Sequence, residues 1–396
     1  MKLVATCPEE TKAALVGELE ALGVQDPKPV FRAVEFEAEP RLAYELHLRL
    51  RTASRLFRVL KEVPAHSPEM LYSQVRRIRW PELFDARHAF MVESVGAETG
   101  PGSMPARQVI TQVREGIRAV FAGAGGRVPP VDTGEPKVVV VAHLARGRCT
   151  LSFDTAGKAL HKRGYRESGH PAPLKETLAA AILRYAGYDG TQAFLDPMCG
   201  SGTLAIEAAM IAVHKAPQIH RKKGDFCLEW LADFDRQLWR EAQEAVRAEK
   251  LDAPRAPVVA SDIEARFVDM ARKSALKARV EKYISFGVGR FQDVEPPAER
   301  GVLVTNLPYG DRIGGSEADV RTLYEEVGDT LKRRFSGWQA AILAASASPY
   351  RAIGLKPGRT IALMNGSIPC KLLLFELYAG SRRPARPPAG EAVAGD

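Results

Sequence analysis

The chain has 396 residues, of which 45% are hydrophobic and 26% are charged, and it carries a formal net charge of +8. These values are typical of a globular protein and exclude a disordered, collagen-like or fibrous chain. The longest apolar runs have only the length of a strand. That excludes an integral membrane protein, because a membrane span needs about 20 apolar residues. The basic excess permits an acidic partner such as RNA without requiring one.

Length and cysteine usage set the expected organisation and compartment. At roughly 150 residues per domain, the chain is expected to have two or three domains. Its five cysteines stand singly, which argues against a disulfide framework and against a zinc site of the CxxC type. The apolar stretch at the start is too short for a signal peptide. We therefore expect a cytoplasmic protein without a bound metal.

The first part of the chain alternates short strand and helix patterns. The predicted elements are strands at 2–7 and 33–37 and helices at 10–22 and 43–60. This order is typical of a ferredoxin-like module. The outer face of the second helix would carry four arginines, which would either be solvated or contact RNA. They are Arg49, Arg51, Arg55 and Arg58.

A second module and a larger third one follow. In the second module we predict helices at 68–78 and 108–121 and strands at 89–92, 137–142 and 149–153. From about residue 171, helices alternate with strand candidates at 193–195, 257–260, 301–305, 340–343, 360–364 and 372–378. Such alternation predicts a mostly parallel, doubly wound α/β sheet. Residues from about 215 to 255 are interpreted as an insertion that Trp230 and Trp239 help to fold.

A glycine loop, Leu-Asp-Pro-Met-Cys-Gly-Ser-Gly-Thr at 195–203, follows a predicted strand and opens a helix. Its glycines let the backbone pass close to a ligand, and the helix start offers unpaired amide donors. Asp196 would repel a pyrophosphate and attract an ammonium group, which favours S-adenosyl-L-methionine over NAD. The alternative is a plain strand–turn–helix corner. The candidate cofactor-binding residues of the loop are Asp196, Pro197, Cys199, Gly200, Ser201, Gly202 and Thr203, with Cys199 as a packing residue rather than a nucleophile.

Two further acidic residues are candidates for the nucleoside part of that cofactor. Asp262, followed by Ile263, ends the next predicted strand, where a carboxylate can accept two ribose hydroxyls. The alternative role of Asp262 is to cap the helix that follows. Asp293 could accept from the adenine amino group, or it could form an Asx turn.

A polar motif, Asn306-Leu307-Pro308-Tyr309, stands at the end of a predicted strand beside the glycine loop. It suits methylation of a planar amine, whose lone pair is delocalised. The Asn306 side-chain oxygen and the Leu307 carbonyl would bind the two amine hydrogens and stabilise the developing charge. Pro308 would fix the backbone, and Tyr309 would stack on the base. The alternative is a simple turn.

These motifs resemble the THUMP-domain RNA guanine-N2 methyltransferases, most closely the bacterial 23S rRNA guanine-N2 methyltransferases. The likeness covers almost the whole chain. It is carried by residues 71–72, 78–81, 160–166, 172–180, 194–203, 306–312 and 364–368. Two departures stand out. Leu307 replaces the family's usual proline, and Arg114-Glu115-Gly116-Ile117 replaces its usual Lys-Asp-Ala-Ile.

The resemblance implies an N-terminal α+β module and a class I, Rossmann-like methyltransferase domain. We expect a ferredoxin-like segment at 1–60, a THUMP RNA-binding domain at 61–155, the methyltransferase domain at 156–380 and a flexible basic tail at 381–396. The family implies S-adenosyl-L-methionine as methyl donor and an RNA guanine as acceptor. Candidate RNA contacts are Lys162, Arg163, Arg166 and Arg312, although the run at 162–166 could be a solvated linker and Arg312 could pair with Asp311.

The leading hypothesis is therefore an RNA guanine-N2 methyltransferase acting on a flipped-out guanine, with 23S rRNA as the expected substrate. Alternatives that keep the same motif are a tRNA guanine, a DNA adenine or a protein glutamine amide as acceptor. A further alternative is an RNA-binding protein that keeps the methyltransferase fold without its activity.

Overall fold

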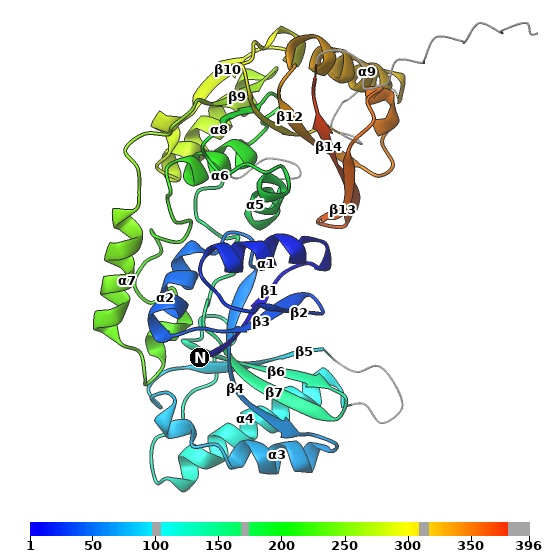
Figure 1. The fold of residues 1–396 in the computed structure, drawn as a ribbon. Helices are drawn as coiled ribbons and strands as arrows, with labels where there is room; N and C mark the ends of the chain where they lie inside the picture. The colour runs from blue at the N-terminus through cyan, green and yellow to red at the C-terminus, as the bar shows by residue number, and fades with distance from the viewer. Residues whose placement is uncertain (97–103, 168–173, 309–316, 379–396) are drawn as a thin grey trace, which may run out of the picture.

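Two seven-stranded sheets organise the chain, one below and one above the middle of the view in Figure 1. The structure is a computed structural model, and it describes residues 1–96, 104–167, 174–308 and 317–378. The expected α/β class with a separate N-terminal α+β part is confirmed. None of the helices in these ranges combines the length and the apolar content that a membrane span requires.

The first sheet runs continuously through the N-terminal 154 residues in the order β2-β3-β1-β4-β7-β6-β5. Its central strand, β4, pairs with β1 on one side and β7 on the other, so the expected boundary at 60/61 falls inside a strand. Among the strands described in this sheet, only β5 and β6 pair in parallel. The strands are β1 (Lys2–Thr6), β2 (Lys28–Val30), β3 (Ala33–Glu37), β4 (Arg55–Pro64), β5 (Phe90–Val95), β6 (Val138–Ala145) and β7 (Arg148–Asp154).

Two pairs of helices cover this sheet. Each pair buries its own apolar cluster, one around Leu15 and Leu46 and the other around Trp80 and Val113. The helices are α1 (Lys12–Ala21), α2 (Pro40–Arg49), α3 (Pro68–Arg76) and α4 (Ala106–Gly123).

The single helix predicted at 43–60 is wrong. Helix α2 ends at Arg49, and β4 begins at Arg55. The turn between them is held by the buried Glu18 carboxylate, which accepts the backbone N–H groups of Arg51 at 2.7 Å and Thr52 at 2.9 Å. Beyond the turn, β-branched and aromatic residues favour a strand, and pairing with β1 and β7 outweighs the helical spacing.

The four arginines of that segment therefore do not form a solvated helix face, and they do not present such a face to RNA. Each guanidinium is engaged within the protein, mostly by a partner distant in sequence. The contacts are Arg49 with Glu249, Arg51 with the Lys215 carbonyl, Arg55 with Asp154 and Arg58 with Asp233.

The second sheet has the order β10-β9-β8-β11-β12-β14-β13. The first five strands are parallel, and β14 runs antiparallel to both of its neighbours, β12 and β13, which confirms the predicted mostly parallel sheet. Strand β10 was not predicted. The strands are β8 (Ala193–Asp196), β9 (Val258–Asp262), β10 (Ser285–Val288), β11 (Gly301–Asn306), β12 (Gln339–Ala345), β13 (Arg359–Asn365) and β14 (Ile368–Glu376).

The chain order reverses at β8, which lies between β9 and β11. In such sheets, ligands bind at the carboxyl ends of the strands beside this switch point. The helices of this part are α5 (Glu176–Tyr185), α6 (Thr203–Ala212), α7 (Arg236–Ala248), α8 (Ala265–Lys277) and α9 (Glu317–Arg334).

Most apolar residues of the insertion between α6 and β9 pack on the N-terminal part. Its helix α7 lies along the left edge of the molecule beside α2 (Figure 1). Trp239 meets Tyr44 edge to face, with ring centroids 5.6 Å apart. The insertion therefore ties the two sheets together.

Candidate active site

A cavity of about 580 Å³ opens at the carboxyl ends of β8, β9 and β11. It lies where the switch point of the sheet predicts a ligand site. Ten of the residues predicted from sequence line it. They are Asp196, Pro197, Cys199, Gly200, Ser201, Thr203, Asp262, Ile263, Asn306 and Pro308.

The glycine loop owes its shape to two left-handed glycines. Gly200 has φ +51° and Gly202 has φ +78°. A Cβ on Gly202 would lie 2.7 Å from the Cβ of Ala271 on α8, closer than atoms can approach. Gly202 does not line the cavity; it lets α6 begin directly against α8. Thr203 and Leu204, the first residues of α6, line the cavity, and the amides of a helix N-terminus suit a carboxylate.

Asp196 is the most deeply buried carboxyl group of the cavity. Its residue is 1% exposed, and its Oδ1 has no hydrogen-bond partner among the residues described. Burial, with Asp262 nearby, raises the pKa of the Asp196 carboxyl to about 8. A buried, unpartnered carboxyl oxygen is costly unless a cation or donor reaches it. An ammonium group bound here would satisfy the oxygen and restore its negative charge.

Asp262 fastens the loop to the neighbouring strand. Its Oδ2 accepts the N–H of Gly200 at 2.9 Å, and its Oδ1 accepts the N–H of Glu264 at 3.0 Å. The residue that caps α8 is Glu264, so Asp262 does not occupy the cap position. Each carboxylate oxygen can accept a second hydrogen bond, and the residue lines the cavity. Next to it, the Ile263 side chain offers an exposed apolar surface.

The structure corrects one candidate by a single position. Asp293 is exposed and lies outside the cavity, whereas Gln292 and the buried Phe291 line it. The Gln292 side chain donates to Glu326 on α9. A short 3-10 helix, Phe291–Asp293, turns these residues in different directions, and nothing in the sequence indicates which one faces inward.

The amide motif extends from the end of β11. Asn306 lines the cavity, and its Oδ1 is buried without a hydrogen-bond partner in the described part of the chain. The Leu307 side chain is buried in the core beneath, and its N–H donates to the Leu343 carbonyl at 3.0 Å. Pro308 lines the cavity. The predicted residues Tyr309 and Arg312 lie outside the described residues.

The basic run at 162–166 is mainly structural. The Arg163 side chain is 1% exposed and pairs with the fully buried Glu207, which also accepts from the Tyr165 hydroxyl at 2.8 Å. Arg166 pairs with Glu176 at 2.9 Å. The prediction that Arg163 contacts RNA is therefore wrong, because its charge is already neutralised inside the protein. Lys162 remains exposed.

Fold and site together define a methyltransferase of class I architecture with an N-terminal α+β part. Comparison with known families agrees. The family described as "RMKL-like, methyltransferase domain", UPF0020, matches residues 163–373, the "RlmL ferredoxin-like domain" matches 2–57, and the THUMP domain matches 65–154. The chain therefore belongs to the UPF0020 methyltransferase family, as the motifs predicted.

Individual relatives cover the chain from end to end. A protein of Synechocystis, provisionally named RNA methyltransferase slr0064, is 34% identical over 94% of this chain and 96% of its own. The ribosomal RNA large subunit methyltransferase K/L of Shewanella oneidensis is 34% identical over 99% of this chain, which spans only 55% of that protein. SMU.472, provisionally titled a methyltransferase and solved with SAH, is 28% identical with a TM-score of 0.84, over 96% of this chain and 99% of its own.

Proposed function

We propose that this chain transfers a methyl group from S-adenosyl-L-methionine to the exocyclic 2-amino group of a guanosine in RNA, with 23S rRNA as the substrate. The observation that carries the proposal is a pair of buried oxygens, Asp196 Oδ1 and Asn306 Oδ1, which have no hydrogen-bond partner among the described residues and lie on the wall of one cavity. One suits an ammonium and the other suits an amine hydrogen.

The cavity residues fit the proposed cofactor part by part. Asp196 holds the ammonium group, and the first amides of α6 hold the carboxylate. Asp262 accepts from the ribose hydroxyls, while Ile263 and Phe291 offer apolar surface to the adenine. When bound, the cofactor supplies an electrophilic methyl group on a sulfonium. The relative SMU.472, solved with SAH, supports this assignment.

Asn306 would prepare the amine for attack. The Asn306 side-chain oxygen and the Leu307 carbonyl accept its two hydrogens, which turns the nitrogen lone pair toward the methyl group and stabilises positive charge as it develops. Leu307 keeps this carbonyl although it replaces the usual proline. Positioning supplies most of the acceleration, since no strong base is needed. Tyr309 would stack on the flipped-out base.

RNA as the acceptor rests on the N-terminal part. Residues 65–154 match the THUMP domain, and relatives that match almost the whole chain bear the name ribosomal RNA large subunit methyltransferase K/L. A module of this size in front of the catalytic domain argues against a small-molecule acceptor and against a protein amide. Cellular RNA lies in the cytoplasm, where the sequence predicts the protein.

The test uses Asn306→Ala with labelled methyl donor and 23S rRNA transcript. We expect a loss of about 100-fold or more in transfer, since removing one such hydrogen-bonding group costs roughly 10²–10³ in rate. The affinity for S-adenosylhomocysteine should stay unchanged. After reaction with the wild-type protein, nucleoside mass spectrometry of the transcript should find N2-methylguanosine. A variant with wild-type turnover would refute the role of Asn306.

Parallel reactions decide between the alternatives. Transfer to tRNA transcripts but not to rRNA would show that the substrate is tRNA and would leave the proposed chemistry unchanged. Methylated adenine found in DNA after the reaction would show that the acceptor base is adenine rather than guanine. Calorimetry that detects no binding of S-adenosylmethionine would favour a non-catalytic RNA-binding protein.

A further inference from the structure

A second cavity, far along α8 from the candidate active site, is lined by cationic side chains. The first turn of α8 borders the active-site cavity, and this second cavity of about 370 Å³ lies beyond its last turn, against the insertion. Within the described part of the chain, no acidic residue lines it. We call it the basic pocket; its basic residues are Lys215, His220, Arg247, Lys250, Arg279 and Lys282, and Tyr283 also lines it.

The positive charge of the basic pocket is not compensated from within. Lys215 is 4% exposed, and its ammonium donates to the Ala278 carbonyl. Burial, followed by the charges of Arg279 and Lys250, lowers the pKa of Lys215 to about 8. Burial, followed by the charges of Lys215 and Arg279, lowers the pKa of His220 to about 4. Lys215 is thus a buried cation with no carboxylate among the residues that line the pocket, and an anion bound there would compensate its charge.

Helix ends explain only part of this cluster. Lys215 and Arg279 follow the last turns of α6 and α8, where a cation complements the helix dipole. Arg279 takes a left-handed backbone with φ +55°, a position usually left to glycine. Lys250 follows the last turn of α7 in the same way, whereas Lys282 complements no α-helix end. The ammonium groups of Lys250 and Lys282 lie 5.5 Å and 4.9 Å from the ring centre of Tyr283.

The basic pocket continues into a larger cleft through Arg247, which lines both. This cleft of about 1340 Å³ lies between the THUMP domain and the insertion. On α7, Arg236 and Arg240 lie on the same helix face as Arg247 and also line the cleft. Among the described residues, none of these three has an ion-pair partner.

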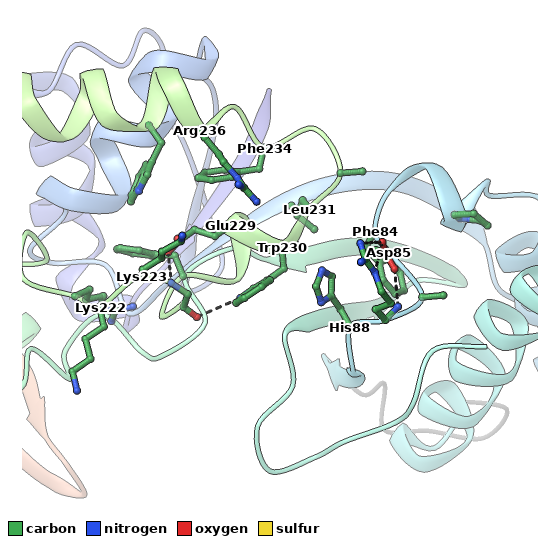
Figure 2. Close-up of a pocket in the computed structure, with 18 of the residues that line it drawn as sticks. Phe84, Asp85, His88, Lys222, Lys223, Glu229, Trp230, Leu231, Phe234 and Arg236 are labelled. Atoms are coloured by element: carbon green, nitrogen blue, oxygen red, sulfur yellow. Dashed lines mark hydrogen bonds and ion pairs between the residues drawn. The ribbon is translucent and has the colours of Figure 1, made fainter. Parts of the chain in front are cut away.

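Figure 2 shows the two walls of the cleft. Lys222, Lys223, Trp230 and Arg236 come from the insertion, and His88 faces them from the THUMP side. The His88 and Trp230 rings meet with centroids 5.0 Å apart. Two acidic residues also line the cleft, but both are engaged. Asp85 pairs with Arg87, and Glu229 accepts the N–H of Gly224.

We propose that the cleft and the basic pocket form one RNA-binding track, with the basic pocket holding a backbone phosphate. The inference rests on the proposed function, since it takes RNA as the substrate. Phosphates suit clustered Lys and Arg side chains, and aromatic rings beside cations suit unpaired bases. The insertion then serves as a second RNA-binding element, which clamps the substrate against the THUMP domain.

The test compares two charge reversals of equal size in the full chain. Lys250→Glu with Lys282→Glu changes two exposed residues of the basic pocket, so folding should be preserved. Lys332→Glu with Lys356→Glu makes the same change on the opposite side of the second sheet, where α9 and β13 lie in Figure 1. Filter binding to 23S rRNA transcript, without cofactor, measures affinity over a range of KCl concentrations.

We expect the basic-pocket variant to bind at least about tenfold more weakly near 0.1 M KCl, with a salt slope smaller by about 1–2, because each lost phosphate contact removes about 0.7–0.9. The control should keep the wild-type slope, and both variants should bind S-adenosylhomocysteine normally. Equal losses of RNA affinity in the two variants, or no loss in either, would overturn the proposed RNA-binding track. Because this readout needs no turnover, it stands even if no RNA is methylated.

A thermal melt distinguishes RNA from a small ligand. Inorganic phosphate is compared with KCl at equal ionic strength. Stabilisation of the wild type that is absent in the basic-pocket variant, combined with unchanged RNA affinity, would assign the pocket to a small phosphorylated molecule and overturn RNA as its occupant.

Discussion

The affinity for the proposed cofactor should depend on pH through Asp196. Burial raises the pKa of this carboxyl from 3.8 to about 8, so the ligand-free protein holds it protonated at neutral pH. An ammonium group binds the carboxylate form. Binding therefore releases a proton, and the association constant should rise tenfold per pH unit below the raised pKa, about 1.4 kcal/mol for each unit.

The pH range of the measurement follows from the pKa values of the Asp196 carboxyl and the ligand's amino group. The ligand's own amino group loses its charge near or above pH 8, so we take the range from about pH 5.5 to about pH 7.5. The expected gain across it is about 100-fold. The raised pKa of Asp196 also makes the stability of the ligand-free protein depend on pH. The protonated carboxyl makes its full contribution to the free energy of unfolding below about pH 4, and this contribution is lost as the pH rises through about 8.

The assay is titration calorimetry with S-adenosylhomocysteine, which carries the same ammonium and carboxylate groups but no methyl to transfer. Two buffers of different ionisation enthalpy should report release of about one proton per ligand near pH 6. Asp196→Asn should bind more weakly, with an affinity that no longer changes with pH. Asp293→Asn is the matched control outside the cavity and should keep the slope. A flat affinity in the wild type would refute the argument.

Two further predictions concern the frame around the site. Arg163→Met should lower the free energy of unfolding in urea by about 3–5 kcal/mol, because it leaves the buried Glu207 carboxylate unpaired. Adding Glu207→Gln should restore part of this, and no recovery would mean that packing rather than charge dominates. Gly202→Ala should destabilise the protein by at least about 1 kcal/mol and weaken cofactor binding, since its φ is +78° and Ala271 blocks a Cβ. Unchanged melting and unchanged affinity would contradict that geometry.

The candidate site could be predicted because its information is contiguous. A strand, a polar residue, two glycines and an apolar helix stand side by side at 193–212, and parallel strands bring their ends together by rule. The glycine loop and Asn306 therefore meet in one cavity, as their positions indicated. The error within the site concerned which of two adjacent residues faces the cavity. Whether Gln292 or Asp293 faces inward depends on one short turn.

The errors in the fold arise from contacts that are distant in sequence. The segment 43–60 has helical spacing, but Glu18 holds a turn in its middle, and β4 finds its partners on two other strands. No pattern within the segment encodes these partners. Tertiary pairing decided the structure where local propensity was ambiguous.

The arginines show why counting cations does not locate an RNA surface. Arg49 finds Glu249, 200 residues away, and so holds α2 to the insertion, whereas Arg163 finds Glu207 within the methyltransferase part. A charge neutralised in this way adds little to the field felt by a polyanion. Lys250 and Lys282 have no carboxylate among the residues around the basic pocket, so their field extends into solvent. The proposed RNA-binding track is therefore built on cations for which the pocket supplies no carboxylate, rather than on every arginine or lysine of the chain.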